Sequence, residues 1–294
     1  MLLRKHIRFR WITLCSVVAL LAALLIPVGI SAILQAHAAT YRYTFSTFTN
    51  SDEFHLYIYQ SSDDLTFTKL AGPAYTPPSG LVRDASITHI GSLYYVAYTD
   101  AWSGKIFGIA SSPDRVHWTY LETVTMPSNT LDTWAPEWFL DSNGSINITV
   151  NLKIGTQFVP EFITARNSTL TSWTQPAPLS GLGGYIDTFV IKANGVYNAF
   201  VVPCDNNYQI CRYTSPSFNG HYTLAGTTTF TDQVEGPAVF QLPNGNWRMF
   251  ADAFHARKFV YSDSTTNFKT WTAEKPLPGL SGIVRHGTVL RETV

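Results

Sequence analysis

The sequence contains little cysteine, little charge and no helical periodicity. It has 3 cysteines in 294 residues, and charged residues make up 14% of the chain with a formal net charge of zero. Zero net charge argues against a nucleic-acid-binding protein held by phosphate contacts, so we expect no nucleic-acid partner. The sequence also has no Gly-x-Ser-x-Gly, His-Glu-x-x-His or phosphate-binding glycine motif, so it lacks the common signatures of serine hydrolases, zinc proteases and P-loop proteins.

The chain is rich in aromatic and aliphatic side chains. It contains 18 Phe, 15 Tyr and 8 Trp, and 45% of its residues are hydrophobic. Disordered proteins are poor in such residues, so this is a globular composition. The length suits one domain of about 250 residues or two smaller ones.

The first 39 residues differ in composition from the rest. Four basic and no acidic residues precede an apolar run over Trp11–Leu34, and Ala36-His37-Ala38 follows as a small-x-small pattern. This order predicts a secretory signal peptide over residues 1–39, with a secreted, extracellular mature domain over residues 40–294. The alternative is an uncleaved anchor helix, because the apolar run is long enough to span a bilayer. After signal cleavage we expect no contact with a membrane.

The mature region retains two cysteines, because Cys15 lies in the apolar run. Cys204 and Cys211 flank six residues that are typical of a hairpin tip. Two cysteines facing each other across a hairpin in an oxidising compartment predict a disulfide between them.

Short alternating strands recur along the mature region with a fixed period. One marker is the residue at the head of a short apolar strand, and its copies are spaced by 49 to 52 residues: Asp84, Ala135, Asp187, Gly236 and His286. A second marker is an aromatic residue after a Ser/Thr-rich turn, spaced by 49 to 55 residues: Phe67, Trp118, Trp173, Tyr222 and Trp271. Repeats of this length with several strands each predict an all-β, five-bladed β-propeller.

The phase of the repeat predicts how the ends of the chain meet. The last head strand, near His286, has no hairpin after it, and Phe67 has no head strand before it. We therefore expect the N-terminal strands, from Tyr41 to about Tyr75, to close the blade that residues 281–294 begin. This closure leaves no open sheet edge in the ring.

The head strands of a propeller line its central axis, so their first residues meet at one mouth of the channel. The repeat thus brings five polar side chains together: Asp84, Glu137, Asp187, Glu235 and His286. A single axial acid would more often bind backbone amides of a neighbouring blade, but several together favour a functional site. Paired carboxylates suit glycoside hydrolysis, in which one protonates the leaving oxygen and the other acts at the anomeric carbon.

At these heads the sequence resembles glycoside hydrolase family 43, a family of five-bladed propeller arabinofuranosidases, arabinanases and xylosidases. The matching segments occur in order over residues 41–294: Asp84-Ala85-Ser86, Trp134-Ala135-Pro136-Glu137, Ile186-Asp187-Thr188 and Glu235-Gly236-Pro237. Ala85 and Thr188 replace prolines of the family pattern, while all the carboxylates remain.

The resemblance implies roles for three carboxylates. Asp84 would be the general base that activates water, Glu235 the general acid, and Asp187 the residue that orients the acid and raises its pKa, with inversion at the anomeric carbon. His286 matches a fifth-blade histidine that lies near a calcium ion in arabinanases, so a structural calcium near His286 is one expectation. The other is that His286 binds a catalytic acid without a metal. No cofactor is otherwise required.

Aromatic residues near the heads are candidates for stacking on sugar rings. We expect substrate contacts from these side chains: Trp102, Trp134, Glu137, Trp138, Phe254 and His286. The expected protein is a monomeric, secreted glycosidase of the α-L-arabinofuranosidase or β-xylosidase type, acting on arabinose- or xylose-containing plant carbohydrate. The alternative is a non-catalytic carbohydrate-binding propeller. Fructan hydrolases have a different head motif around their first aspartate, and sialidases have six blades.

Overall fold

The computed structural model describes residues 40–203, 208–228, 230–265 and 267–294. Over these ranges the chain forms strands and no helix, so the all-β prediction is confirmed. The same ranges contain no helix that could cross a membrane. The expected signal peptide over residues 1–39 and Cys204 lie outside the described residues. Cys211 is disulfide-bonded, but its pairing with Cys204 stays a prediction.

The first sheet has eight strands in the order β3-β2-β1-β20-β4-β5-β6-β7. Its antiparallel halves meet at one parallel pair, Gly287 opposite Ala85, between β20 and β4. One half contains β1 (Tyr41–Thr49), β2 (Asp52–Ser61), β3 (Thr68–Tyr75) and β20 (Val284–Thr293). The other half contains β4 (Arg83–Ile90), β5 (Leu93–Thr99), β6 (Ile106–Ser112) and β7 (Thr119–Thr125).

Three further sheets have four strands each. The second contains β8 (Thr130–Leu140), β9 (Ile146–Ile154), β10 (Gln157–Thr164) and β11 (Ala177–Pro178). The third contains β12 (Ile186–Ala193), β13 (Val196–Val202), β14 (Cys211–Ser215) and β15 (Thr223–Thr227). The fourth contains β16 (Glu235–Gln241), β17 (Trp247–Ala253), β18 (Lys258–Ser264) and β19 (Lys275–Pro276).

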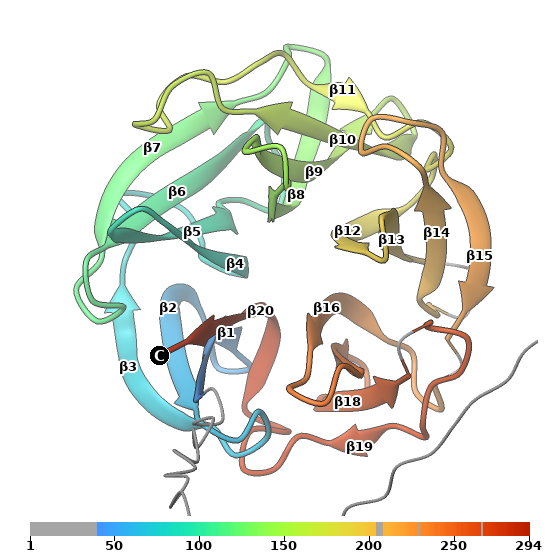
Figure 1. The fold of residues 1–294 in the computed structure, drawn as a ribbon. Coiled ribbons are helices and arrows are strands. Elements are labelled where there is room, and N and C mark those ends of the chain that lie inside the picture. Colours follow the sequence, from blue (N-terminus) through green and yellow to red (C-terminus); the bar gives the residue numbers. More distant parts are fainter. Residues whose placement is uncertain (1–39, 204–207, 229, 266) are drawn as a thin grey trace, which may run out of the picture. The chain divides into compact units, whose positions relative to one another are not determined.

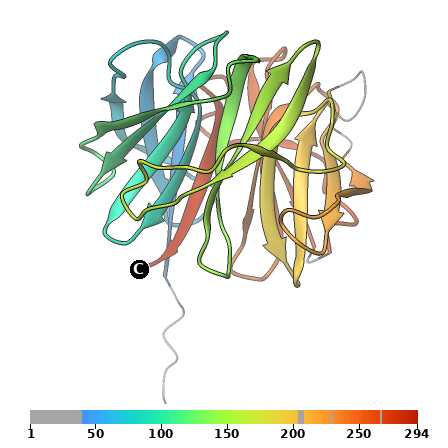
Figure 2. The same cartoon turned by 90° about the horizontal axis from the view of Figure 1, so that it is seen from above.

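The sheets are arranged around a common centre. Figure 1 shows β4, β8, β12, β16 and β20 nearest the centre, with β3, β7, β15 and β19 on the outside. Figure 2, turned by 90°, shows that the innermost strands run across the thickness of the fold. Their first residues therefore lie at one mouth of the central channel and their last residues at the other.

The first and last strands of the described region pair with each other. Antiparallel partners run from Tyr41 opposite Thr293 to Thr49 opposite Val284. Residues about 250 positions apart in the sequence thus share one sheet and place β20 between β1 and β4.

The recurring aromatic residues pack in the hydrophobic core. The described residues form five core clusters. Three of them include a recurring aromatic residue, namely Phe67, Trp118 and Tyr222, and the partly buried Trp173 and Trp271 pack against the other two. Burying an aromatic side chain of this size stabilises the fold by about 1.5–3 kcal/mol. The second marker of the repeat is therefore a packing feature, and the heads of the innermost strands are left to form the site.

Candidate active site

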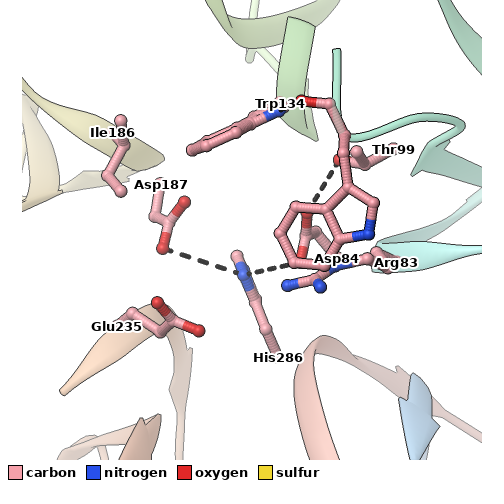
Figure 3. Close-up of a pocket in the computed structure, with 9 residues that line it drawn as sticks. Arg83, Asp84, Thr99, Trp134, Ile186, Asp187, Glu235 and His286 are labelled. Carbon is pink, nitrogen blue, oxygen red and sulfur yellow. Dashed lines mark hydrogen bonds and ion pairs between the residues drawn. The ribbon is translucent and has the colours of Figure 1, made fainter. Parts of the chain in front are cut away.

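A pocket with about 440 Å³ of empty space, part of it open solvent, lies at the first residues of the innermost strands. Nine residues line it: Arg83, Asp84, Thr99, Trp102, Trp134, Ile186, Asp187, Glu235 and His286. The three carboxylates predicted to be catalytic are all present, and they come from three different sheets (Figure 3). The predicted substrate residues Trp102, Trp134 and His286 also line this pocket.

A β-bulge at each strand head explains this convergence. In all five innermost strands two residues stand opposite one on the neighbouring strand, as Asp84 and Ala85 do opposite Tyr98. The backbone is left-handed at four equivalent positions, with φ of 53° at Asp84, 46° at Ala135, 53° at Asp187 and 61° at Gly236. Such bulges redirect side chains. In β4 and β12 the head residue and the residue before it both line the pocket, whereas β8 and β16 contribute only the residue before the head and β20 contributes only the head, His286.

His286 lies at the centre of the carboxylates and is 2% exposed. Its Nδ1 is 3.3 Å from Oδ1 of Asp84 and 3.8 Å from Oδ2 of Asp187. Its Nε2 is 3.5 Å from Oε1 of Glu137. Burial alone would lower the pKa of His286, but the charge of Asp187 and the contacts with Asp84 and Glu137 raise it well above its usual value. His286 is therefore an imidazolium at neutral pH.

Asp84 is held in its ionised form. Its Oδ2 accepts a 2.7 Å hydrogen bond from the Thr99 hydroxyl, and its Oδ1 faces His286. Burial opposes ionisation, but the contact with His286 and its positive charge, followed by the charge of Arg83 and the Thr99 hydrogen bond, outweigh burial and lower the pKa of Asp84 to about 2. The Thr99 hydroxyl also accepts the Ala135 N–H at 2.8 Å, which ties β5 to the head of β8.

The pKa of Glu235 is raised, whereas that of Asp84 is lowered. Burial, followed by the negative charges of Asp187 and Asp252, raises the pKa of Glu235 to about 8. Asp187 accepts a 3.0 Å hydrogen bond from the Gly236 N–H, which fixes it beside the head of β16. Burial raises the pKa of Asp187, and the charge of His286 partly offsets this. Glu235 is thus protonated at neutral pH in the same pocket where Asp84 is ionised.

Glu137 lies behind this group. It is 2% exposed and does not line the pocket, and neither of its carboxyl oxygens has a hydrogen-bond partner among the described residues. Burial raises the pKa of Glu137 to about 7, although the contact with the His286 ring and the charge of that ring oppose this rise. The structure therefore gives Glu137 a place against the imidazolium and not against a substrate in the pocket.

The predicted aromatic contacts divide into three groups. Trp102 is 53% exposed, and its carbonyl oxygen accepts the Trp134 indole N–H at 3.0 Å, so the two side chains form one wall. Phe254 packs against Tyr208 at 5.4 Å between ring centroids and does not line the pocket. Trp138 does not line this pocket, because its side chain is buried in the core and borders a different cavity, and its contact with substrate stays a prediction.

The sequence reasoning missed several residues of the site. Arg83 lines the pocket, and its guanidinium lies 3.7 Å from the centroid of the Trp102 ring. Arg285 donates from Nη2 to Oε1 of Glu235 at 3.3 Å. Each arginine directly precedes a head residue. Glu235 occupies the same position in its own repeat, one residue before Gly236. Treating that position as equivalent in every repeat would have found them.

The donor set around His286 does not fit a calcium ion. Both ring nitrogens face carboxylates at 3.3 to 3.8 Å, and an imidazolium has no free lone pair to offer a metal. Across the described parts of the chain, no group of three or more His, Cys, Asp or Glu side chains could hold a metal ion. His286 contacts the acids directly, as the metal-free alternative requires, and the absence of a metal at this site stays a prediction.

Comparison with known proteins identifies the family. The profile described as "Probable glycosyl hydrolase domain", of the family 43-related group, matches residues 39–293. Among curated proteins no match was found.

Solved structures resemble the chain in fold. A thermostable family-43 glycoside hydrolase is 20% identical, with a TM-score of 0.53 over 68% of this chain and 75% of that one. An endo-1,4-β-xylanase from Bacteroides thetaiotaomicron is 13% identical, with a TM-score of 0.61 over 84% and 93%. An exo-β-1,3-galactanase from Clostridium thermocellum is 16% identical, with a TM-score of 0.57 over 70% of this chain and 50% of that one. The chain belongs to the glycosyl hydrolase family 43-related domain family.

Proposed function

We propose that the protein is a secreted inverting glycosidase that cleaves arabinose- or xylose-containing plant polysaccharide or oligosaccharide. One observation carries the proposal: a single pocket holds an ionised carboxylate, Asp84, and a carboxyl group with a raised pKa, Glu235. Two carboxyl groups with opposite protonation states are what acid/base cleavage of a glycosidic bond requires. Family membership supports the same chemistry.

In the proposed reaction, Asp84 accepts a proton from a water molecule. The water oxygen forms a bond to the anomeric carbon while the bond from that carbon to the leaving oxygen breaks. The electron pair of the broken bond stays on the leaving oxygen, which takes the proton of Glu235. The low pKa of Asp84 makes it a weak base, but water becomes strongly acidic as it bonds to an oxocarbenium-like carbon, so a late proton transfer suffices.

Asp187 supports the acid electrostatically in this proposal. After burial, its negative charge is the largest cause of the raised pKa of Glu235, ahead of Asp252 and Asp84. The charge therefore keeps Glu235 protonated at neutral pH. Trp102 and Trp134 supply the wall on which a sugar ring would stack.

The proposal includes a five-bladed propeller closed by its first and last strands. The eight-stranded sheet divides at the Gly287–Ala85 pair into two groups of four, and each other sheet also has four strands. The pairing of β1 with β20 supports closure. An experimental structure with six blades, or with β1 away from β20, would contradict it.

The experiment is a screen of the purified domain on aryl arabinofuranosides, aryl xylosides and arabinan. Proton NMR of the first-formed sugar should show inverted configuration, and Asp84→Asn and Glu235→Gln should each nearly abolish turnover. Retention of configuration would overturn the mechanism. Binding of these carbohydrates without hydrolysis would favour the alternative, a carbohydrate-binding propeller. Mass spectrometry of the secreted protein, with a mature N-terminus near Thr40, would test the signal peptide.

A further inference from the structure

We propose that Arg285 is a positioning residue that fixes the orientation of Glu235, and that the buried carboxylate of Asp252 holds Arg285 for this task. The inference rests on the proposed function, because it assigns Arg285 a role through the general acid. Neither residue is a candidate from the sequence motifs. Both belong to a contact network behind the pocket.

The guanidinium of Arg285 joins two carboxyl groups. Its Nε donates to Oδ2 of Asp252 at 2.7 Å, and its Nη2 donates to Oε1 of Glu235 at 3.3 Å. A guanidinium is planar and rigid, so fixing one edge also fixes the direction of its other donors. The tight contact with Asp252 therefore determines where Nη2 meets Glu235.

Asp252 is placed for this role by the sheet itself. It stands opposite Glu235 in the pairing of β16 with β17, and it is 0% exposed. Oδ2 of Asp252 also accepts a 3.0 Å hydrogen bond from the backbone N–H of His286, and this bond links β17 to the bulge of β20. A fully buried carboxylate is costly unless it is paired, so Asp252 and Arg285 depend on each other.

The contact selects which oxygen of Glu235 carries the proton. A carboxyl group has one O–H, and Arg285 can only donate. Since Nη2 donates to Oε1, that oxygen acts as the acceptor, and the acidic proton resides on Oε2. Arg285 thereby presents Oε2 as the proton-donating oxygen, and random rotation of the carboxyl group is suppressed.

This arrangement does not ionise Glu235. The closer partner of Arg285 is Asp252, at 2.7 Å against 3.3 Å, so most of its charge is already compensated. Burial and the charges of Asp187 and Asp252 keep the pKa of Glu235 at about 8. Arg285 can therefore orient the acid without removing its proton.

Arg83, which lines the pocket, provides a matched control for Arg285. It occupies the same repeat position, one residue before the head, and both guanidinium groups lie near the Phe48 ring, at 4.9 and 5.5 Å. However, Arg83 donates to Glu53 at 3.1 Å and stacks on Trp102. Loss of Arg83 should thus affect the pocket wall, whereas loss of Arg285 should affect proton donation.

The test compares two aryl glycosides of the sugar that the wild type hydrolyses. The phenyl glycoside needs protonation of its leaving oxygen by the general acid. The dinitrophenyl glycoside does not, because 2,4-dinitrophenolate is a stable enough anion to depart without a proton. A positioned general acid contributes roughly 10²- to 10⁴-fold. We expect Arg285→Met to lower kcat roughly 10- to 100-fold on the phenyl glycoside, within that contribution, and much less on the dinitrophenyl glycoside. Arg83→Met should lower both rates by a similar factor.

Reference variants distinguish failure of the proposed function from failure of the role assigned to Arg285. If Glu235→Gln shows no leaving-group dependence, the proposed function is wrong. If Glu235→Gln shows it but Arg285→Met lowers both rates equally, only the role of Arg285 is overturned. Arg285→Lys and Asp252→Asn, which keep the charge or the shape, provide the same readout should Arg285→Met fail to fold. Equal losses on both substrates in these two variants would also overturn the inference.

Discussion

The imidazole of His286 lies against the backbone of Gly236. A Cβ added at Gly236 would stand 2.4 Å from Cγ of that ring, and φ at Gly236 is 61°. Only glycine fits this approach, since the site combines left-handed backbone with a buried aromatic ring that cannot retreat. The head of β16 and the head of β20 are thus fitted to each other at the centre of the site.

The first prediction is that Gly236→Ala is strongly destabilising. The left-handed backbone alone costs about 1–2 kcal/mol for alanine. Overpacking against His286 adds about 1–3 kcal/mol. Gly245→Ala is the matched control, because φ there is 85° but no atom lies within 4 Å of the added Cβ. Urea unfolding should show a clearly larger loss for Gly236→Ala, and equal losses would contradict the close packing.

The second prediction concerns the pH dependence of kcat/KM. Glu235 must be protonated to act as an acid, so activity should fall as the pH rises through about 8. Asp187→Asn removes a negative charge that raises the pKa of Glu235, so this fall should begin at lower pH. Asp232→Asn, at a carboxylate paired with Lys258 on the surface, should leave it in place. An unchanged profile for Asp187→Asn would exclude the electrostatic role.

The third prediction is that the Thr99 hydroxyl stabilises both the fold and the charge of Asp84. Thr99→Val removes the donor to Asp84 and the acceptor for the Ala135 N–H. An unsatisfied buried group costs about 1–3 kcal/mol, so stability should fall by this amount. The pKa of Asp84 should rise, which moves the acid limb of kcat/KM to higher pH. Thr99→Ser keeps the hydroxyl and should resemble the wild type in both measurements.

The fourth prediction is that a chelator does not affect activity. Because both nitrogens of His286 face carboxylates, we expect EDTA and added calcium to leave kcat unchanged. His286→Ala should still lower kcat, since Asp84 then loses a hydrogen bond and a nearby positive charge. Loss of activity in EDTA that calcium restores would show that a metal acts at this site.

The periodic heads of the sequence predicted which carboxylates meet, because a repeat fixes position around an axis. The bulges could not be predicted from spacing, and they decide which neighbours of the heads reach the pocket. Trp134 and Trp138 illustrate the limit. A strand rises about 3.3 Å per residue, so Trp138 lies roughly 13 Å further from the mouth than Trp134. The bulge between Trp134 and Glu137 also changes the alternation of side chains.

Asp252 could not be found, for a different reason. Its importance comes from its contact with Arg285, which lies 33 residues further along the sequence on another strand. Asp252 belongs to neither marker of the repeat, whereas Arg285 could have been found from its repeat position. The pattern of acids identified the reacting groups, whereas the residues that hold them depend on the packing of side chains behind the pocket.

The pairing of β1 with β20 has a consequence for how the protein is made. His286 and Arg285 lie on β20, whose partner strand is almost the whole chain away. Bringing distant segments together is slow compared with forming local hairpins. During synthesis, the earlier sheets can form while β20 is still missing. The pocket then lacks its central cation, so hydrolytic activity should appear only once β20 has paired with β1 and should report on a chain in which this sheet is complete.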